Sequence, residues 1–470
     1  MLAALWACAP KGPPDVLVVS LDTLRADRLG AYGGPPGLTP NLDRFASEGV
    51  TFLRAYSQGT FTAPSHASLF TSRYPPELVR TGRHPAVGGD KPTLAEVLGA
   101  YGYETGAFVA GGDLAPEIGL DVGFDVYESP RDFGSLFHTA PPALAWIDAR
   151  PADTPWLAFV HSYDTHSPYR RPPPLGSLVS DPERKGPGGE ALRTQMARVA
   201  DGFLMHDLRP FLFIDGTWAR PRSPAGRAEL AQVLAGDPSV PRLDEADLAQ
   251  IRGAYDGAVA YADARFGLLL AQLDRRGVLD DSVVVVLSDH GEGMHEAGVF
   301  NHCCQVDDAT THVPLLVRLP GGERGGAKVD AIVELTDVAP TLYELAGAQA
   351  PAGARGVSFA AALRGEPFAG REVAWTTGSD GMRMTSGRSR DGRLTWSGTP
   401  PWAPGLADLL AAAALPGPGF VVEGTIDAER ARGEMASFVR SLKTLPPTDA
   451  RPVSPRLERE LREHGYWGSP

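Results

Sequence analysis

The sequence feature that most restricts the fold is a series of short apolar runs separated by helical patterns. The runs are rich in β-branched residues and lie at 15–22, 103–110, 155–161, 282–288 and 313–319. Runs of this length, bounded by turn residues, are typical of strands that are buried on both faces of a sheet. Because helical patterns separate most of the runs, they predict βαβ units and therefore an α/β fold around a parallel sheet.

The clearest helix is expected between Asp244 and Gly277. Asp244 is a suitable N-cap residue, and Gly277 is typical of a helix end. Between them, apolar side chains recur at spacings of three and four residues, namely Leu248, Ile251, Tyr255, Val259, Ala262, Phe266, Leu269 and Leu273. This helix leads directly into the run at 282–288, so the two form half of a crossover connection.

Two other regions depart from the βαβ pattern. Residues 168–241 are punctuated by proline and glycine, and they predict an insertion over the sheet edge with one short helix near 192–203. After about residue 366, the pattern changes to short strands and helices. We therefore expect a main domain over 15–370 and a small C-terminal α+β subdomain over 371–470.

Within the C-terminal subdomain, a hairpin is expected over 382–396. Its turn signal is Asp391-Gly392, which lies between two short candidate strands. Two helices are expected to follow, over 427–442 and over 454–465.

The composition argues against several classes of protein. The chain carries 57 acidic residues against 44 lysines and arginines, a net charge of -13, and has no basic run that would follow a phosphate backbone, so nucleic acid is not an expected partner. With 43% hydrophobic residues it is globular and not disordered. No apolar stretch approaches the roughly 18 residues of a transmembrane helix.

The three cysteines build neither a disulfide framework nor a zinc site of the Cys-x-x-Cys type. Cys303 and Cys304 are expected to be buried free thiols, in preference to metal ligands or a strained disulfide. Residues 5–8 (LWAC) resemble a bacterial lipobox, so 1–14 are either the remnant of a lipoprotein signal with its tether or an ordinary terminus. The first alternative implies an exported protein, periplasmic or anchored to the membrane through a lipid at Cys8.

Polar side chains follow three of the predicted strands. The first strand ends at Asp22, the third ends at His161, and the fourth is followed by Asp289, His290 and Glu292. Ligands of open α/β sheets bind beyond the carboxyl ends of the strands, so we expect these side chains to converge. Carboxylates with an imidazole suit a divalent cation, Ca²⁺, Mg²⁺ or Mn²⁺ by the oxygens and Mn²⁺ or Zn²⁺ by the histidine.

A hydroxyl-rich segment at 59–71 lies between the first and second expected strands. Pro64 stands near what looks like a helix N-terminus, where anions are stabilised. The local sequence alone favours Thr62 as the N-cap residue of that helix.

Seven motifs follow one another along the chain: DVLVVSLDTLRADRLG (15–30), TPNLD (39–43), TAPSHASLFT (62–71), FVHSYDTHSPY (159–169), SDHGE (288–292), HVPLLVRLPG (312–321) and DVAPT (337–341). In kind and in order they resemble the motifs of the sulfatase family, within the alkaline phosphatase superfamily. The resemblance covers residues 15–365. The resemblance implies an α/β fold, the alkaline-phosphatase-like three-layer sandwich with a mainly parallel central sheet, and a hydrolase of sulfuric or phosphoric esters.

The resemblance also implies a site. Asp22, Asp289 and His290 would hold one divalent metal ion, and the nucleophile Thr62 would complete its shell. The ion would be Ca²⁺, Mn²⁺ or Mg²⁺, with Zn²⁺ as a further alternative.

Further roles follow from the same resemblance. His302 and His166 correspond to residues that touch the substrate oxygens or leaving group, which makes them candidates for the general acid. Glu292 is expected to orient a neighbour and not to bind the metal. The insertion at 168–241 would cap the pocket and select the substrate.

The sequence departs from true sulfatases at the nucleophile. Their formylglycine forms from Cys or Ser in a C/S-x-P-x-R motif, whereas this chain has Thr62 and replaces the arginine with His66. Thr23 replaces a second acidic metal ligand, and Ala297 stands where His or Asp is common. A formylglycine hydrate expels sulfate by collapsing to the aldehyde, an exit that a threonine ester lacks. We therefore expect phosphoester chemistry, as in the phosphodiesterases and phosphotransferases of the superfamily.

Two other interpretations remain open. One is a conventional sulfatase that acts on aryl or carbohydrate sulfates without formylglycine. The other is a catalytically silent binding lipoprotein of the same fold. For an active enzyme, the expected substrate is a small molecule or a glycan or lipid ester, and the oligomeric state stays open.

Overall fold

The computed structural model describes residues 12–78, 85, 87–167, 169, 245–294, 296, 300–302, 305–378, 384–397 and 419–442. These residues form a nine-stranded sheet in the order β11-β2-β10-β6-β1-β5-β3-β4, with β9 paired to β2. The strands are β1 (Asp15–Leu21), β2 (Val50–Tyr56), β3 (Glu104–Phe108), β4 (Val126–Glu128), β5 (Trp156–Ser162), β6 (Ser282–Leu287), β9 (His312–Val313), β10 (Leu315–Arg318) and β11 (Ala327–Glu334). Most neighbours are parallel, but β10 is antiparallel to both β2 and β6.

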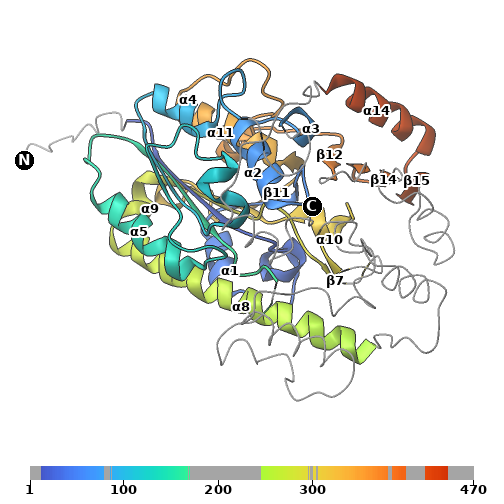
Figure 1. Cartoon of the computed structure of the whole chain (residues 1–470), viewed down its shortest axis with the longest axis horizontal. Coiled ribbons are helices and arrows are strands. Elements are labelled where there is room, and N and C mark those ends of the chain that lie inside the picture. Colours follow the sequence, from blue (N-terminus) through green and yellow to red (C-terminus); the bar gives the residue numbers. More distant parts are fainter. Residues whose placement is uncertain are drawn as a thin grey trace, which may run out of the picture.

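Helices cover both faces of this sheet, as Figure 1 shows. One face carries α2 (Thr62–Thr71), α4 (Leu94–Ala100) and α11 (Val338–Leu345), and the other carries α1 (Pro40–Ser47), α5 (Leu136–Asp148) and α8 (Glu245–Arg275). The result is a three-layer α/β sandwich, so the predicted fold class is confirmed.

Side chains of β1 alternate between the two hydrophobic cores. Val16 and Val18 pack on the face covered by α2, whereas Leu17 and Val19 pack on the face covered by α8. Because side chains alternate along a strand, Ser20 follows Val16 and Val18 on the α2 face. This alternation decides which polar residues at the strand end meet α2.

Each predicted apolar run contains a strand, but β2 and β11 were not predicted from the sequence. Both interrupt their apolar residues with charges, Arg54 in β2 and Asp330 in β11, and these two side chains pair at 2.6 Å. Strands β2 and β11 are parallel neighbours at the end of the sheet. These charges interrupt the apolar runs by which buried strands are recognised, so the sequence pattern did not indicate the two strands.

The long helix expected between Asp244 and Gly277 is confirmed as α8. Its apolar stripe is buried, and Tyr255 and Phe266 are among the largest fully buried side chains. The chain leaves the helix at Gly277, whose φ of 69° is left-handed and favours glycine.

The C-terminal part forms a second, smaller sheet with an antiparallel order β12-β13-β14-β15, beside α14 in Figure 1. These elements are β12 (Ala374–Thr377), β13 (Met384–Arg388), β14 (Gly392–Ser397), β15 (Gly419–Gly424) and α14 (Ala428–Ser441). The predicted hairpin at Asp391-Gly392 is confirmed. Asp427 caps α14 by accepting hydrogen bonds from the backbone N–H groups of Glu429 and Arg430.

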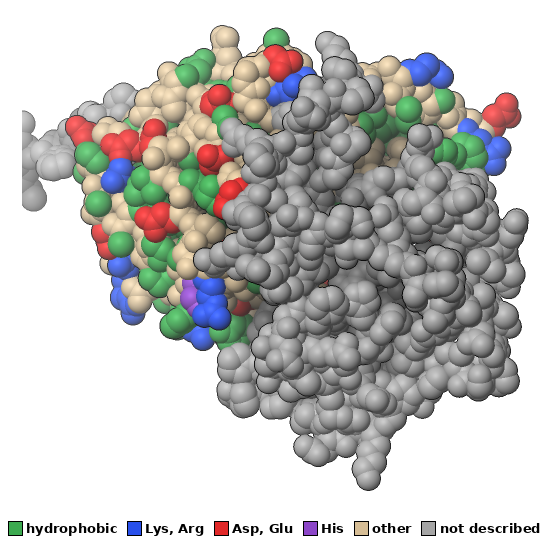
Figure 2. Space-filling view, in the orientation of Figure 1, with side chains coloured by type: hydrophobic (Ala, Val, Ile, Leu, Met, Phe, Trp, Pro, Cys, Tyr) green, Lys and Arg blue, Asp and Glu red, His purple; other side chains and the backbone are tan. Residues whose placement is uncertain are grey.

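Several sequence predictions lie outside the described residues. They concern the N-terminal segment with Cys8, the insertion at 168–241 apart from Tyr169, the pair Cys303 and Cys304, the substitution at Ala297 and the last expected helix at 454–465. Among the helices that the structure describes, none is long and apolar enough to span a membrane. On the described part of the face in Figure 2, lysines and arginines are interspersed with acidic and hydrophobic side chains.

Candidate active site

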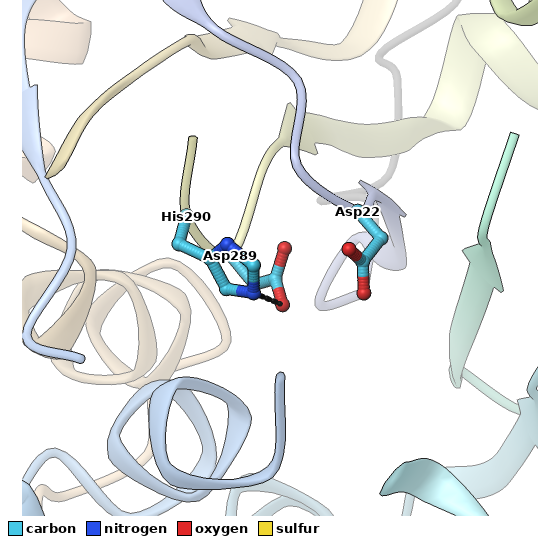
Figure 3. Close-up of side chains that lie close together, drawn as sticks. All are labelled: Asp22, Asp289 and His290. Atoms are coloured by element: carbon cyan, nitrogen blue, oxygen red, sulfur yellow. Dashed lines mark ion pairs between the residues drawn. The ribbon is translucent and has the colours of Figure 1, made fainter. Parts of the chain in front are cut away.

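The three central strands bring their polar ends together. Strand β1 lies between β5 and β6, so Asp22, which follows β1, lies next to Asp289 and His290, which follow β6. Their ligand atoms all lie within 4.8 Å of one another, and all three side chains are fully buried. Figure 3 shows the carboxylates of Asp22 and Asp289 facing each other, with His290 beside Asp289. The convergence expected at the strand ends is confirmed for these residues.

Three buried polar atoms without a hydrogen bond converge in this group. Asp22 Oδ1, Asp289 Oδ2 and His290 Nε2 are buried and make no hydrogen bond within the part of the chain that the structure describes. The Nδ1 of His290 donates to the Gly291 carbonyl at 2.9 Å, and its Nε2 faces Asp289 Oδ2 at 3.4 Å. Buried polar atoms without hydrogen bonds are costly, and two carboxylate oxygens and an imidazole nitrogen that lie this close together suit a cation.

The electrostatics of the two carboxylates lead to the same conclusion. Burial, together with the charge of Asp289, raises the pKa of Asp22 well above its usual range. Burial also opposes ionisation of Asp289, but the neighbouring His290 and the hydrogen bond from the Thr23 backbone bring its pKa below the usual value overall. Two adjacent carboxylates in a dry site repel each other unless a cation lies between them. The residues present therefore fit a divalent metal ion.

Thr62 contacts this group through its hydroxyl. Helix α2 begins at Thr62, and the extended residue Phe61 occupies the N-cap position. The Thr62 hydroxyl caps no backbone group and instead donates to Asp22 Oδ2 at 3.0 Å. The N-cap interpretation of Thr62 is therefore wrong, because its hydroxyl donates to the carboxylate of Asp22, which follows β1. The oxygen lies at a helix N-terminus, where negative charge is stabilised.

His302 forms a pair with Glu292 beside the metal group. His302 Nδ1 and Glu292 Oε1 form a hydrogen bond of 2.9 Å, and burial raises the pKa of Glu292 to about 8. The ring of His302 lies 4.4 Å from that of His290, between centroids. Glu292 therefore fixes the orientation of His302, as an orienting residue would.

His166 extends this row of imidazoles. Its Nδ1 donates to the Ser167 carbonyl at 2.6 Å, and its ring centroid lies 5.3 Å from that of His302. The six candidate catalytic and metal-binding residues from the sequence thus lie in one continuous cluster. They are Asp22, Thr62, His166, Asp289, His290 and His302.

Two further buried histidines belong to the site. His161 was expected to converge there with the other strand ends, whereas His66 was noted only as the residue that replaces an arginine. His66 contacts Ser20 and Thr62, and His161 Nε2 lies 3.5 Å from Asp22 Oδ2. Burial lowers the pKa of both rings to about 4, so both are neutral at pH 7. For His66 the information missing from the sequence was the strand register. In the assembled sheet Ser20 lies beside His161 and faces α2, which brings it to His66.

Thr23 serves the site through its backbone. Its N–H donates to Asp289 Oδ1 at 3.3 Å, and its carbonyl accepts a hydrogen bond from the Tyr255 hydroxyl at 2.6 Å. A φ of 57° is unusual for a β-branched residue and marks a constrained turn after β1. The residue that replaces a second acidic ligand therefore holds one of the remaining carboxylates in place.

Comparison with known proteins agrees with this geometry. The model of the family described as sulfatase matches residues 14–348. The N-acetylglucosamine-6-O-sulfatase of Bacteroides thetaiotaomicron is 24% identical over 403 residues, covering 75% of this chain and 71% of that protein. Arylsulfatase A of Bos taurus is 29% identical over 378 residues, covering 74% and 67%. Among solved structures, the phosphonate monoester hydrolase of Agrobacterium radiobacter has a TM-score of 0.63 at 19% identity, covering 94% and 99% of the two chains.

Proposed function

The chain belongs to the sulfatase family and is a hydrolase of sulfuric or related esters, and from this premise we propose that it cleaves phosphoric esters with Thr62 as the nucleophile. The observation that carries the proposal is the 3.0 Å hydrogen bond from the Thr62 hydroxyl to Asp22, inside the buried group that fits a metal ion.

Asp22, Asp289 and His290 would hold the ion, and the Thr62 oxygen would complete its shell. A divalent cation supplies two things here, a lower pKa for the bound hydroxyl and neutralisation of charge on a non-bridging oxygen of the ester. The donor set of two carboxylates, one hydroxyl and one imidazole suits Mn²⁺, Ca²⁺ or Mg²⁺, and the imidazole also admits Zn²⁺.

The proposed reaction has two steps. The Thr62 oxygen attacks phosphorus, its proton passes to Asp22 Oδ2, and the bond to the leaving oxygen breaks. His302 or His166 supplies the proton that the leaving oxygen takes up. Water then attacks the phosphorus of phosphorylated Thr62 and gives a proton to the histidine that protonated the leaving oxygen. The bond between the Thr62 oxygen and phosphorus breaks, Thr62 takes back its proton from Asp22, and the phosphate product leaves.

The preference for phosphorus over sulfur rests on the second step. An ester on threonine has no aldehyde to collapse into, so water must attack the central atom directly. The relatives whose names describe sulfatases favour the alternative of a conventional sulfatase that uses threonine. A small molecule or a glycan or lipid ester would be the substrate in either case.

We expect the metal-depleted protein to gain thermal stability when Mn²⁺ is added. A ligand present at 100 times its Kd stabilises the folded state by about 2.7 kcal/mol, because it binds the native site and not the unfolded chain. Asp289→Ala should lose this response, whereas Asp148→Ala, which changes an exposed aspartate paired with Arg276, should keep it. Differential scanning calorimetry with and without Mn²⁺ measures both; an unchanged melting temperature in the wild type would refute the site.

A substrate panel separates the candidate functions. With Mn²⁺ present, kcat/KM for bis(p-nitrophenyl) phosphate should exceed that for p-nitrophenyl sulfate by at least about tenfold, or roughly 1.4 kcal/mol in transition-state stabilisation. The reverse order would support the conventional sulfatase. Binding of Mn²⁺ without turnover of any phosphate, phosphonate or sulfate ester would support the silent binding protein.

A further inference from the structure

Two hydrogen bonds lie side by side between β1 and α2. In the first, Thr62 donates to Asp22 at 3.0 Å, and in the second, Ser20 Oγ and His66 Nε2 lie 2.9 Å apart. Ser20 lies in β1, and Asp22 follows two residues later, just beyond the strand end. Thr62 and His66 lie four residues apart on α2. Both spacings put the two side chains on the same side of their element. The His66 bond therefore runs parallel to the bond that holds Thr62.

Both ring nitrogens of His66 have a partner. Nδ1 lies 2.8 Å from the carbonyl oxygen of Thr62, and because a carbonyl only accepts, Nδ1 carries the hydrogen. Nε2 is then placed to accept from the Ser20 hydroxyl, 2.9 Å away. His66 thus uses both nitrogens to connect the backbone of Thr62 with the strand that ends in Asp22.

Packing leaves the ring of His66 no room to turn. It meets Phe159 edge to face at a centroid distance of 5.6 Å, and His161 at 5.2 Å with an interplanar angle of 89°. The side chain is fully buried, and so is that of Ser20. A hydrogen bond between two packed, buried groups is a rigid connection and not a fluctuating one.

We propose that His66, acting through Ser20, is a positioning residue that sets the place of the Thr62 hydroxyl against Asp22. The inference rests on the proposed function, because it requires Thr62 to be the attacking group. Preorganisation of this kind matters for the rate, since a displacement of about 1 Å at a reacting group costs on the order of 100-fold. His66 Nδ1 also lies 3.6 Å from Asp289 Oδ2, beyond hydrogen-bond distance, so its two hydrogen bonds are to Ser20 and to the helix that carries Thr62.

Ser20→Ala tests the proposal with the loss of a single oxygen. With bis(p-nitrophenyl) phosphate and Mn²⁺, kcat should fall by about tenfold or more, while KM and the Mn²⁺ affinity stay within about threefold, because only the position of the nucleophile changes. Ser68→Ala is the matched control, since it removes a buried hydroxyl of α2 whose one hydrogen bond among the described residues is to the Pro64 carbonyl within the helix. Equal activity of the two variants would overturn the proposal.

Substitutions at His66 distinguish its two hydrogen bonds. The side-chain amide of glutamine reaches the place of Nε2, where its oxygen can accept from the Ser20 hydroxyl. The side-chain amide of asparagine reaches the place of Nδ1, where its nitrogen can donate to the Thr62 carbonyl. His66→Gln should therefore retain more kcat than His66→Asn, because it keeps the connection to Ser20. His66→Ala combined with Ser20→Ala should lose no more than His66→Ala alone, since both remove one bridge. Additive losses, or asparagine outperforming glutamine, would contradict the bridge.

Two controls separate this inference from the proposed function. Thr62→Ala, assayed alongside, should be inactive; if it is active, the nucleophile is wrong and the positioning role fails with it. If Thr62→Ala is inactive and Ser20→Ala keeps full kcat, the positioning role alone fails. Nitrogen NMR of the ¹⁵N-histidine protein reads the bridge without turnover, because a neutral His66 protonated at Nδ1 is expected, and protonation at Nε2 would overturn it.

Discussion

Thr62→Ala is expected to abolish turnover of phosphoric esters while the metal site stays largely intact. The change removes the attacking oxygen, and removal of a nucleophile typically lowers kcat on the order of 10⁴-fold or more. Asp22, Asp289 and His290 remain, so Mn²⁺ should still bind. Steady-state kinetics with bis(p-nitrophenyl) phosphate and calorimetric titration with Mn²⁺ measure the two effects on one preparation.

Two variants control this result. Thr62→Ser keeps the hydroxyl and should retain measurable activity. Thr71→Ala removes another buried threonine hydroxyl of α2, which donates to the Ala67 carbonyl and to no other group in the described part of the chain, and should leave kcat close to that of the wild type. Full activity of Thr62→Ala with bound Mn²⁺ would mean that water attacks the ester directly.

Among the substitutions proposed for this protein, Arg371→Ala is expected to lower the free energy of unfolding the most. Arg371 pairs with Asp337 and lies 3.4 Å from Glu334, and both carboxylates are buried. Glu334 also accepts hydrogen bonds from the Tyr74 hydroxyl and the Trp375 backbone, so this network joins the small sheet to the main one. Removing the cation leaves two buried carboxylates uncompensated, at a cost of about 3–5 kcal/mol. Urea unfolding followed by circular dichroism measures the loss.

The same variant should show a diagnostic dependence on pH. Burial raises the pKa of Glu334 in the folded protein, and loss of Arg371 removes the group that opposes this rise. A carboxyl whose folded pKa is raised costs stability above its unfolded pKa and stops costing it once it is protonated. The difference between Arg371→Ala and wild type should therefore shrink as the pH falls from 7 towards 5.

Arg364→Ala provides the control for an exposed arginine. Arg364 pairs with Glu344 and Glu366 at the surface, where an ion pair contributes roughly 0–1 kcal/mol. A loss as small as this in Arg371→Ala would show that the buried network carries no more than surface charges do.

Much of the fold could be predicted because buried strands and amphipathic helices leave simple patterns. The runs of β1, β5 and β6 and the stripe of α8 depend only on side-chain period and burial. Strand direction leaves no such pattern, so nothing in the run of β10 indicated that it is antiparallel to its neighbours. Strands β2 and β11 were hidden because Arg54 and Asp330 are satisfied by each other across the sheet.

The site divides in the same way. Asp22, Asp289 and His290 follow strands, so the rule that ligands bind at strand ends was enough to group them. Thr62 was different, because a threonine at a helix start has a common local role, and only the carboxylate of a distant strand showed that the role does not apply. His161 follows the same rule as the end of β5, but the place of His66 depends on which residues of β1 share the face covered by α2, and that information belongs to the assembled sheet.

The stereochemistry of phosphoryl transfer tests the central claim most directly. A phosphorothioate diester of one configuration at phosphorus is hydrolysed by the Mn²⁺-loaded enzyme in isotopically labelled water, and the configuration of the product is read by phosphorus NMR. Attack by Thr62 followed by attack of water gives two inversions, so the account predicts net retention. Net inversion would show a single displacement by water and would contradict Thr62 as the nucleophile.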